Sequence, residues 1–141
     1  MDAREYFAQV PELKKHIKRV KEKIRRYREI SASPRSPSLE QHYNPNPNTA
    51  SPFEKLLLEI SELEQELDEL QKIYNNLNTE AKYILCQLDD DNERLTLQHR
   101  YLEGMSYVDI ADELYRSERS VYRYEEAGLR HIIIPENHIE I

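Results

Sequence analysis

The chain of 141 residues contains a single cysteine, two glycines and no tryptophan. One thiol, Cys86, excludes an internal disulfide, so a cytoplasmic location is expected. Two glycines cannot build a glycine-rich phosphate loop, and their scarcity beside 33% charged residues favours helix over sheet. No apolar run is long enough to cross a membrane, and we expect no secretory signal. An all-α, cytoplasmic protein without membrane contacts is predicted.

The residue types that build metal or catalytic centres are dispersed along the chain. Carboxylates are abundant, but they fall at positions typical of solvated helical surfaces, and the acidic run at residues 89–91 fits the solvated end of a helix. The histidines lie in different segments and show no metal-ligand spacing with the lone cysteine: they are His16, His42, His99, His131 and His138. The sequence therefore predicts no enzyme, no metal site and no cofactor.

The net charge of −7 is unfavourable for a nucleic-acid-binding protein, because contacts to phosphates supply most non-specific affinity. This average hides a strong asymmetry between segments. Residues 2–30 contain ten Lys and Arg against five Asp and Glu, a balance of +5, whereas residues 51–89 and 90–141 each have a balance of −6. Each segment is therefore interpreted by itself.

A heptad seam runs through the basic segment and predicts an amphipathic helix over residues 1–30. Apolar or aromatic residues recur there at alternating steps of four and three, at Tyr6, Val10, Leu13, Ile17, Val20, Ile24 and Tyr27. Pro11 interrupts the seam early. The helix either starts near Pro11 or is broken there after a short N-terminal helix.

A linker and a second long helix follow. Residues 31–51 are rich in Ser, Pro and Asn and have no periodicity, which predicts a flexible linker. Ser51 and Pro52 are typical of an N-cap and a first helical residue, and Glu54 follows closely. From Leu56 onward apolar residues repeat at four and three without a slip, which predicts one acidic heptad helix over 52–89.

The two seams have opposite charges, so we expect the helices to pair as a long coiled-coil hairpin, which the linker is long enough to allow. The basic side chains of the first helix then face the acidic helix, although a basic helix can also bind phosphates. The alternative is that each seam pairs with its copy in a second chain. The Ile-rich end of the chain, including the tail 135–141, is a second surface for packing or homodimer formation.

Residues 90–134 have the spacing of a helix-turn-helix. Gly104 can leave a helix in the left-handed conformation, and Ser106, with Asp109 three residues on, is placed to cap the next helix. Ser117 can cap a second helix that ends near His131. The expected inward side chains are Tyr107, Ile110, Ala111, Leu114, Val121, Tyr124, Gly128 and Leu129.

The outward face of that second helix has the donors, acceptors and flat apolar edges that a groove-reading helix needs. Arg119 and Arg123 suit bidentate contacts with guanine; the alternative is pairing with acidic neighbours one turn away on the same helix, Glu118 and Glu126. Tyr122 suits a thymine methyl or a phosphate, or is an exposed tyrosine without a role. Arg116, in the turn, and Arg100 are candidates for contacts with phosphates.

Residues 97–132 resemble region 4 of bacterial sigma factors, the part that reads an upstream promoter element. The likeness lies in Arg100-Tyr101, Gly104-Met105-Ser106-Tyr107, Asp109-Ile110-Ala111, Ser117, Val121 and Leu129-Arg130. The wider layout is similar to the ArpU-type transcriptional regulators of Firmicute phages and prophages. Those proteins open with an Arg-Glu-Tyr-type stretch, matched here by Ala3-Arg4-Glu5-Tyr6-Phe7, and continue with a basic helix, a Ser/Pro linker, a long Leu/Glu helix and a sigma-like unit.

This resemblance implies a regulator of phage late or packaging genes that binds double-stranded DNA near their promoters. The base-reading positions of region 4 then fall on Glu118, Arg119, Ser120, Tyr122 and Arg123. Sigma factors carry several arginines on this helix, whereas acidic residues balance them here, which leaves room for a homodimer or for action through RNA polymerase. Two alternatives stay open: a small terminase-like packaging or assembly protein, and a sigma-like module that binds RNA polymerase rather than DNA.

Overall fold

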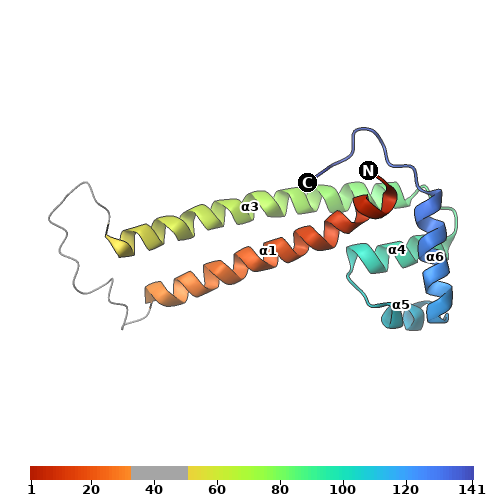
Figure 1. Ribbon diagram of the computed structural model, residues 1–141, viewed down its shortest axis with the longest axis horizontal. Helices are drawn as coiled ribbons and strands as arrows, with labels where there is room; N and C mark the ends of the chain where they lie inside the picture. Colours follow the sequence, from red (N-terminus) through yellow and green to blue (C-terminus); the bar gives the residue numbers. More distant parts are fainter. Residues whose placement is uncertain (33–50) are drawn as a thin grey trace. The chain divides into compact units, whose positions relative to one another are not determined.

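The computed structural model describes residues 1–32 and 51–141, and its regular structure there is helical throughout (Figure 1). The elements are α1 (Ala3–Ala32), α3 (Pro52–Leu85), α4 (Asp91–Leu97), the π-helical turn η1 (Gln98–Leu102), α5 (Tyr107–Leu114) and α6 (Glu118–His131). The all-α prediction is confirmed for this part of the chain. The predicted linker at 31–51 lies almost entirely outside the described residues.

The described residues form two compact units. Unit 1 comprises Met1–Lys14 and Ile73–Ile141, and unit 2 comprises Lys15–Lys72, so α1 and α3 each contribute to both. The sequence places its boundary between the long helices and the C-terminal helices, at residue 89. The contacts group the first 14 residues of the chain with residues 73–141, which include the last part of α3.

Helix α1 runs without interruption through Pro11, so both predictions for this residue, a helix start and a break, are wrong. Proline inside a helix costs about 3 kcal/mol because it lacks an N–H group and clashes with the preceding turn. On either side of Pro11, however, Tyr6, Phe7, Val10 and Leu13 are 0–4% exposed. Burial of each such side chain is worth roughly 1.5–3 kcal/mol, so the packing of unit 1 outweighs the local cost.

Helix α3 begins as predicted and ends earlier. The Ser51 hydroxyl accepts the N–H of Glu54 at 3.1 Å, and the Glu54 carboxylate accepts the N–H of Ser51 at 3.3 Å, a reciprocal capping box. The helix ends at Leu85 rather than at residue 89. Three successive tighter turns follow, in which the N–H groups of residues 86–88 bond to carbonyls three residues back. They keep Leu88 buried, which explains why the apolar periodicity outlasts the helix.

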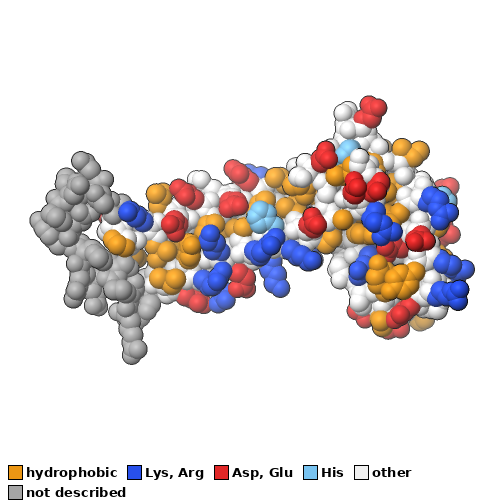
Figure 2. All heavy atoms as spheres, viewed as in Figure 1, with side chains coloured by type: hydrophobic (Ala, Val, Ile, Leu, Met, Phe, Trp, Pro, Cys, Tyr) orange, Lys and Arg blue, Asp and Glu red, His pale blue; other side chains and the backbone are white. Residues whose placement is uncertain are grey.

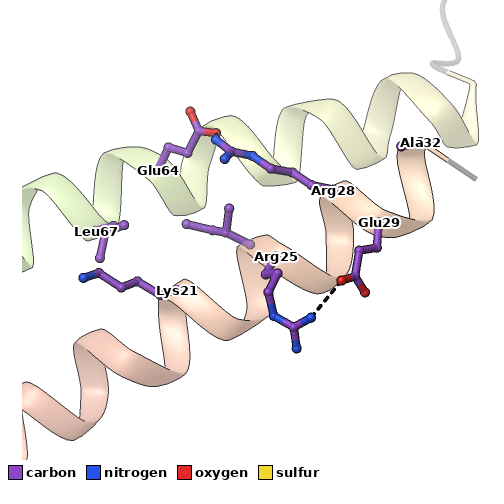
Figure 3. A pocket seen from close by; sticks show the side chains of 8 residues that line it. Lys21, Arg25, Arg28, Glu29, Ala32, Glu64 and Leu67 are labelled. Atoms are coloured by element: carbon purple, nitrogen blue, oxygen red, sulfur yellow. Dashed lines mark hydrogen bonds and ion pairs between the residues drawn. The ribbon is translucent and has the colours of Figure 1, made fainter.

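In unit 2 the remainder of α1 lies beside the first part of α3 (Figures 1 and 3). The apolar side chains Ile17, Val20, Ile24 and Ile60 are 6–8% exposed. Among the described residues, the expected opposite charges meet in the pair Arg28–Glu64, and the His16 ring lies beside Glu66. All four side chains are well exposed, and exposed ion pairs contribute only about 0–1 kcal/mol. Apolar burial is therefore the main stabilising term in this unit.

The core of unit 1 combines both ends of the sequence. Tyr6 and Phe7 are fully buried, and Phe7 packs against Tyr101 with ring centroids 5.9 Å apart. Leu77, Ile84, Leu85 and Leu97 complete this core at 1% exposure or less. Helices α4 and α6 cross closely at Gly128, where an added Cβ atom would lie 3.0 Å from the Cδ1 atom of Leu97. None of the helices in residues 1–32 and 51–141 has a stretch long and apolar enough to cross a membrane.

Candidate nucleic-acid interface

Helices α5 and α6 begin at the residues that the sequence indicated, and α6 ends at His131 as expected. Gly104 has φ +71°, the left-handed conformation expected before α5. The Ser106 hydroxyl accepts the N–H of Asp109 at 3.2 Å, and the Ser117 hydroxyl accepts the N–H of Ser120 at 3.2 Å. The predictions for Gly104, Ser106 and Ser117 are therefore confirmed. Each cap satisfies an N–H group that a helix start leaves without a partner.

The inner sides of α5 and α6 pack against each other. Ile110, Ala111 and Val121 form a buried cluster, against which Tyr107 and Leu114 lie partly buried. Farther along α6, Gly128 and Leu129 are buried and Tyr124 is half-buried. The predicted inward face is confirmed, and its packing fixes which side of α6 faces solvent.

One feature of the turn at residues 115–117 was missed from the sequence. Tyr115 ends α5 in the left-handed conformation, with φ 54°, and is 93% exposed. This conformation costs a residue with a Cβ atom roughly 1–2 kcal/mol. A glycine at such a position is a clear signal in a sequence, but a tyrosine gives none. The only indication of this tight turn in the sequence was the three-residue connection between two capped helices.

The outward face of α6 carries the predicted site residues. Glu118, Arg119, Tyr122, Arg123 and Glu126 are all exposed, while Ser120 is half-buried. Figure 2 shows basic side chains over this helix. Arg123 lies against Ser120, with Nη2 3.5 Å from the hydroxyl oxygen. The ion pairs found in residues 1–32 and 51–141 include neither Arg119 nor Arg123, so pairing with Glu118 or Glu126 is not seen there.

The two arginines predicted to contact phosphates differ in their surroundings. Arg116 is exposed in the turn before α6. Arg100 is half-buried, and its guanidinium lies over the ring of Tyr107, 4.1 Å from the centroid. Its Nη1 also donates to the carbonyl oxygen of Met105 at 3.1 Å. Arg100 therefore has two partners inside the protein, whereas Arg116 presents its charge to solvent.

A buried carboxylate holds the inner side of α6 in unit 1. Glu125 is 4% exposed; it accepts from Nη1 of Arg4 and from the hydroxyl of Tyr101, each at 3.3 Å. Burial, followed by the negative charge of Glu125, raises the pKa of Tyr101 to about 12. Sequence reasoning missed this network because its members lie up to 121 positions apart. It positions the helix, and its buried groups present no surface to a ligand.

Other candidate sites are weaker. No group of three or more His, Cys, Asp or Glu residues in the described part of the chain could hold a metal ion. A shallow groove of about 450 Å³ lies between α1 and α3 in unit 2 (Figure 3). Four of its five charged residues already have partners: Arg25 binds Glu22 and Glu29, and Arg28 binds Glu64. The groove therefore does not offer a set of converging charges for a ligand.

The candidate interface is thus the exposed face of α6 with the turn that precedes it. Its helices are capped locally, its inner side is fixed by buried contacts, and its outer side presents arginines and a tyrosine. Comparisons of the chain with models of protein families, with curated proteins and with solved structures give no match.

Proposed function

We propose that the protein binds double-stranded DNA through a helix-turn-helix formed by α5 and α6, with α6 in the major groove. The observation that carries this proposal is the exposed face of α6, on which Arg119, Tyr122 and Arg123 lie together while the opposite side is buried. The major groove of DNA admits a helix, and arginine and apolar ring edges recognise guanine and thymine there. The Ser117 cap supports a rigid start of the reading helix, and the Ser106 cap does the same for α5, on which that helix packs.

The burial of two carboxylates also supports the proposal, because it lowers the negative charge exposed near α6. Two carboxylates near α6, Glu93 and Glu125, are 8% and 4% exposed and face His131 and Arg4, respectively. Both carboxylates are included in the net charge of −6 for residues 90–141, but they add little negative charge to the exposed surface. Exposed Glu118 and Glu126 remain on α6, so we expect modest non-specific affinity and a strong dependence on base contacts.

The biological role we propose is transcriptional regulation of phage or prophage late or packaging genes, which rests on the resemblance to sigma region 4 and to ArpU-type regulators. In this proposal α1 and α3 form a coiled-coil hairpin that sets the oligomeric state or contacts RNA polymerase. The polymerase-binding role is favoured by one observation, the exposed carboxylates of Glu118 and Glu126 beside the arginines. A cytoplasmic location belongs to the same proposal.

The test is selection of bound fragments from host and phage genomic DNA near 0.1 M salt. Wild-type protein is compared with the Arg119→Ala/Arg123→Ala double variant. Because one bidentate guanine contact is worth about 1–3 kcal/mol, we expect the variant to lose at least tenfold in affinity for the selected sites. Promoter-proximal sites indicate transcriptional control, and sites near a packaging origin indicate a packaging protein.

A matched control removes the same charge elsewhere. Arg19 and Arg26 are exposed on α1, and the Arg19→Ala/Arg26→Ala variant should select the same sites as wild type. Equal selection by the α6 variant and wild type would show that α6 is not the reading helix. If folded wild-type protein enriches no site, DNA recognition is wrong and polymerase binding becomes the leading function.

A further inference from the structure

A stack of three side chains connects the inside of unit 1 to the outward face of α6. The guanidinium carbon of Arg100 lies 4.1 Å from the centroid of the Tyr107 ring. The rings of Tyr107 and Tyr122 follow, with centroids 4.3 Å apart and planes inclined by 34°. Each layer comes from a different element: Arg100 from η1, Tyr107 from the start of α5 and Tyr122 from α6. The stack therefore fixes the position of one outward side chain relative to two other elements.

The two inner layers are held by the rest of unit 1. Arg100 is half-buried and donates to the carbonyl oxygen of Met105 at 3.1 Å. Tyr107 is partly buried against the cluster of Ile110, Ala111 and Val121. Only the outer layer, Tyr122, is well exposed, at 49%. Its ring is held before any ligand arrives, so binding there would cost little side-chain entropy.

The neighbours of Tyr122 identify the ligand chemistry that this ring suits. Arg119 and Arg123 lie three residues before it and one residue after it on α6, and both are exposed. Side chains three or four apart on a helix are about 5–6 Å apart at Cβ, and base pairs are about 3.4 Å apart along DNA. A guanidinium suits guanine, and a flat apolar ring suits the C5-methyl group of thymine. Tyr122 and Arg119 have this spacing, so they can meet bases within about two steps of each other.

We propose that Tyr122 reads a thymine methyl group within about two base pairs of a guanine contacted by Arg119. This inference rests on the proposed DNA-binding function and adds a residue-level specificity to it. Arg100 is then a positioning residue that acts through Tyr107, because its guanidinium is already stacked and hydrogen-bonded inside the protein. A contact from the Tyr122 hydroxyl to a phosphate is the competing role, and it would carry no sequence information.

The experiment replaces single thymines of the selected site by deoxyuridine, which lacks only the C5-methyl group. Wild-type protein should lose about threefold to fivefold in affinity at one position, the value of one methyl group removed from an apolar contact. Tyr122→Ala should bind more weakly and be indifferent to that replacement. Tyr122→Phe should keep the full preference for thymine, because the ring rather than the hydroxyl makes the contact. If Tyr122→Phe loses as much affinity as Tyr122→Ala and no thymine is sensitive, the proposal is wrong.

Arg100→Ala tests the positioning role with a readout that simple loss of charge does not produce. The variant should lower the discrimination between thymine and deoxyuridine toward onefold while leaving the salt dependence of binding close to that of wild type. An arginine that contacts a phosphate should do the opposite, reducing the salt slope by about one and keeping the discrimination. Arg130→Ala, which removes an exposed charge of α6 outside the stack, is the control and should retain the discrimination.

Failure of this inference is distinguishable from failure of the proposed function. If the protein binds specific sites and replacement of each thymine by deoxyuridine leaves the affinity unchanged, only the role of Tyr122 is overturned. Absence of any selected site with folded wild-type protein overturns both DNA recognition and the thymine contact.

Discussion

Glu125 and Glu126 are neighbours on α6 with opposite surroundings. The carboxylate of Glu125 is buried and accepts from Arg4 and Tyr101, whereas Glu126 is exposed on the outward face. Hydrogen bonds to a buried charged group contribute about 1.5–3 kcal/mol, and exposed polar side chains contribute much less. The two residues therefore offer a matched comparison of an internal support with a surface charge.

We predict that Glu125→Gln lowers the free energy of unfolding by about 1–3 kcal/mol. The substitution keeps the shape of the side chain, removes its charge and places an amide nitrogen in a buried position. Urea unfolding followed by circular dichroism measures the change. Glu126→Gln should stay within about 0.5 kcal/mol of wild type. Equal effects of the two substitutions would contradict a structural role for the buried carboxylate.

At the scale of elements, α1 and α3 place a proline in two contrasting positions. Pro52 is the first residue of α3, where the missing N–H group costs nothing because a helix start leaves it without a partner. Pro11 is inside α1, where its N–H group is absent from the helical ladder and the ring crowds the preceding turn. Helix propensity thus favours Pro52 at its position and disfavours Pro11 at its position.

We expect Pro11→Ala to raise the free energy of unfolding by about 1–3 kcal/mol, because the substitution restores a helical hydrogen bond. Pro52→Ala should change it by less than about 1 kcal/mol and in the destabilising direction, since proline also restricts the unfolded chain. Thermal unfolding of both variants beside wild type measures these changes. A destabilised Pro11→Ala variant would show that the proline is required by packing rather than tolerated.

Elements whose signals are local could be predicted from the sequence. The capping residues Ser51, Ser106 and Ser117, and the left-handed Gly104, were placed correctly because each acts on residues within one turn. The path of α1 through Pro11 could not be predicted, because the compensation comes from side chains packed in unit 1. The same holds for Arg100, whose stacking on Tyr107 depends on how η1 meets α5.

At the scale of the whole chain, unit 1 has two tyrosines whose hydroxyls lie beside carboxylates. The Tyr6 hydroxyl donates to Glu80 at 2.6 Å, and burial, followed by that hydrogen bond, raises its pKa far above its usual range. The pKa of Tyr101 is raised to about 12, from an ordinary tyrosine value of 10.0. In the folded protein both groups therefore stay protonated at a pH where the unfolded chain ionises.

These raised pKa values predict alkaline destabilisation. A group with a raised pKa in the folded state contributes stability that is complete below its unfolded pKa and is lost as the pH rises through the folded value. We expect the free energy of unfolding to fall from about pH 10 to about pH 12, and Tyr101→Phe to reduce the steepness of that fall. Urea unfolding at several pH values measures it, and identical profiles for variant and wild type would contradict the assignment.

Unit 1 is built from the first residues of the chain and from its C-terminal part, which has a consequence for folding during synthesis. Arg4 and Glu125 are in contact although 121 positions separate them, and Phe7 packs on Tyr101 across a comparable span. During translation, α1 leaves the ribosome long before α6 has been synthesised. Contacts between such distant positions form slowly. The first 14 residues therefore lack their packing partners until the end of the chain has been synthesised. A prematurely terminated product would lack α6, whose exposed face we propose binds DNA.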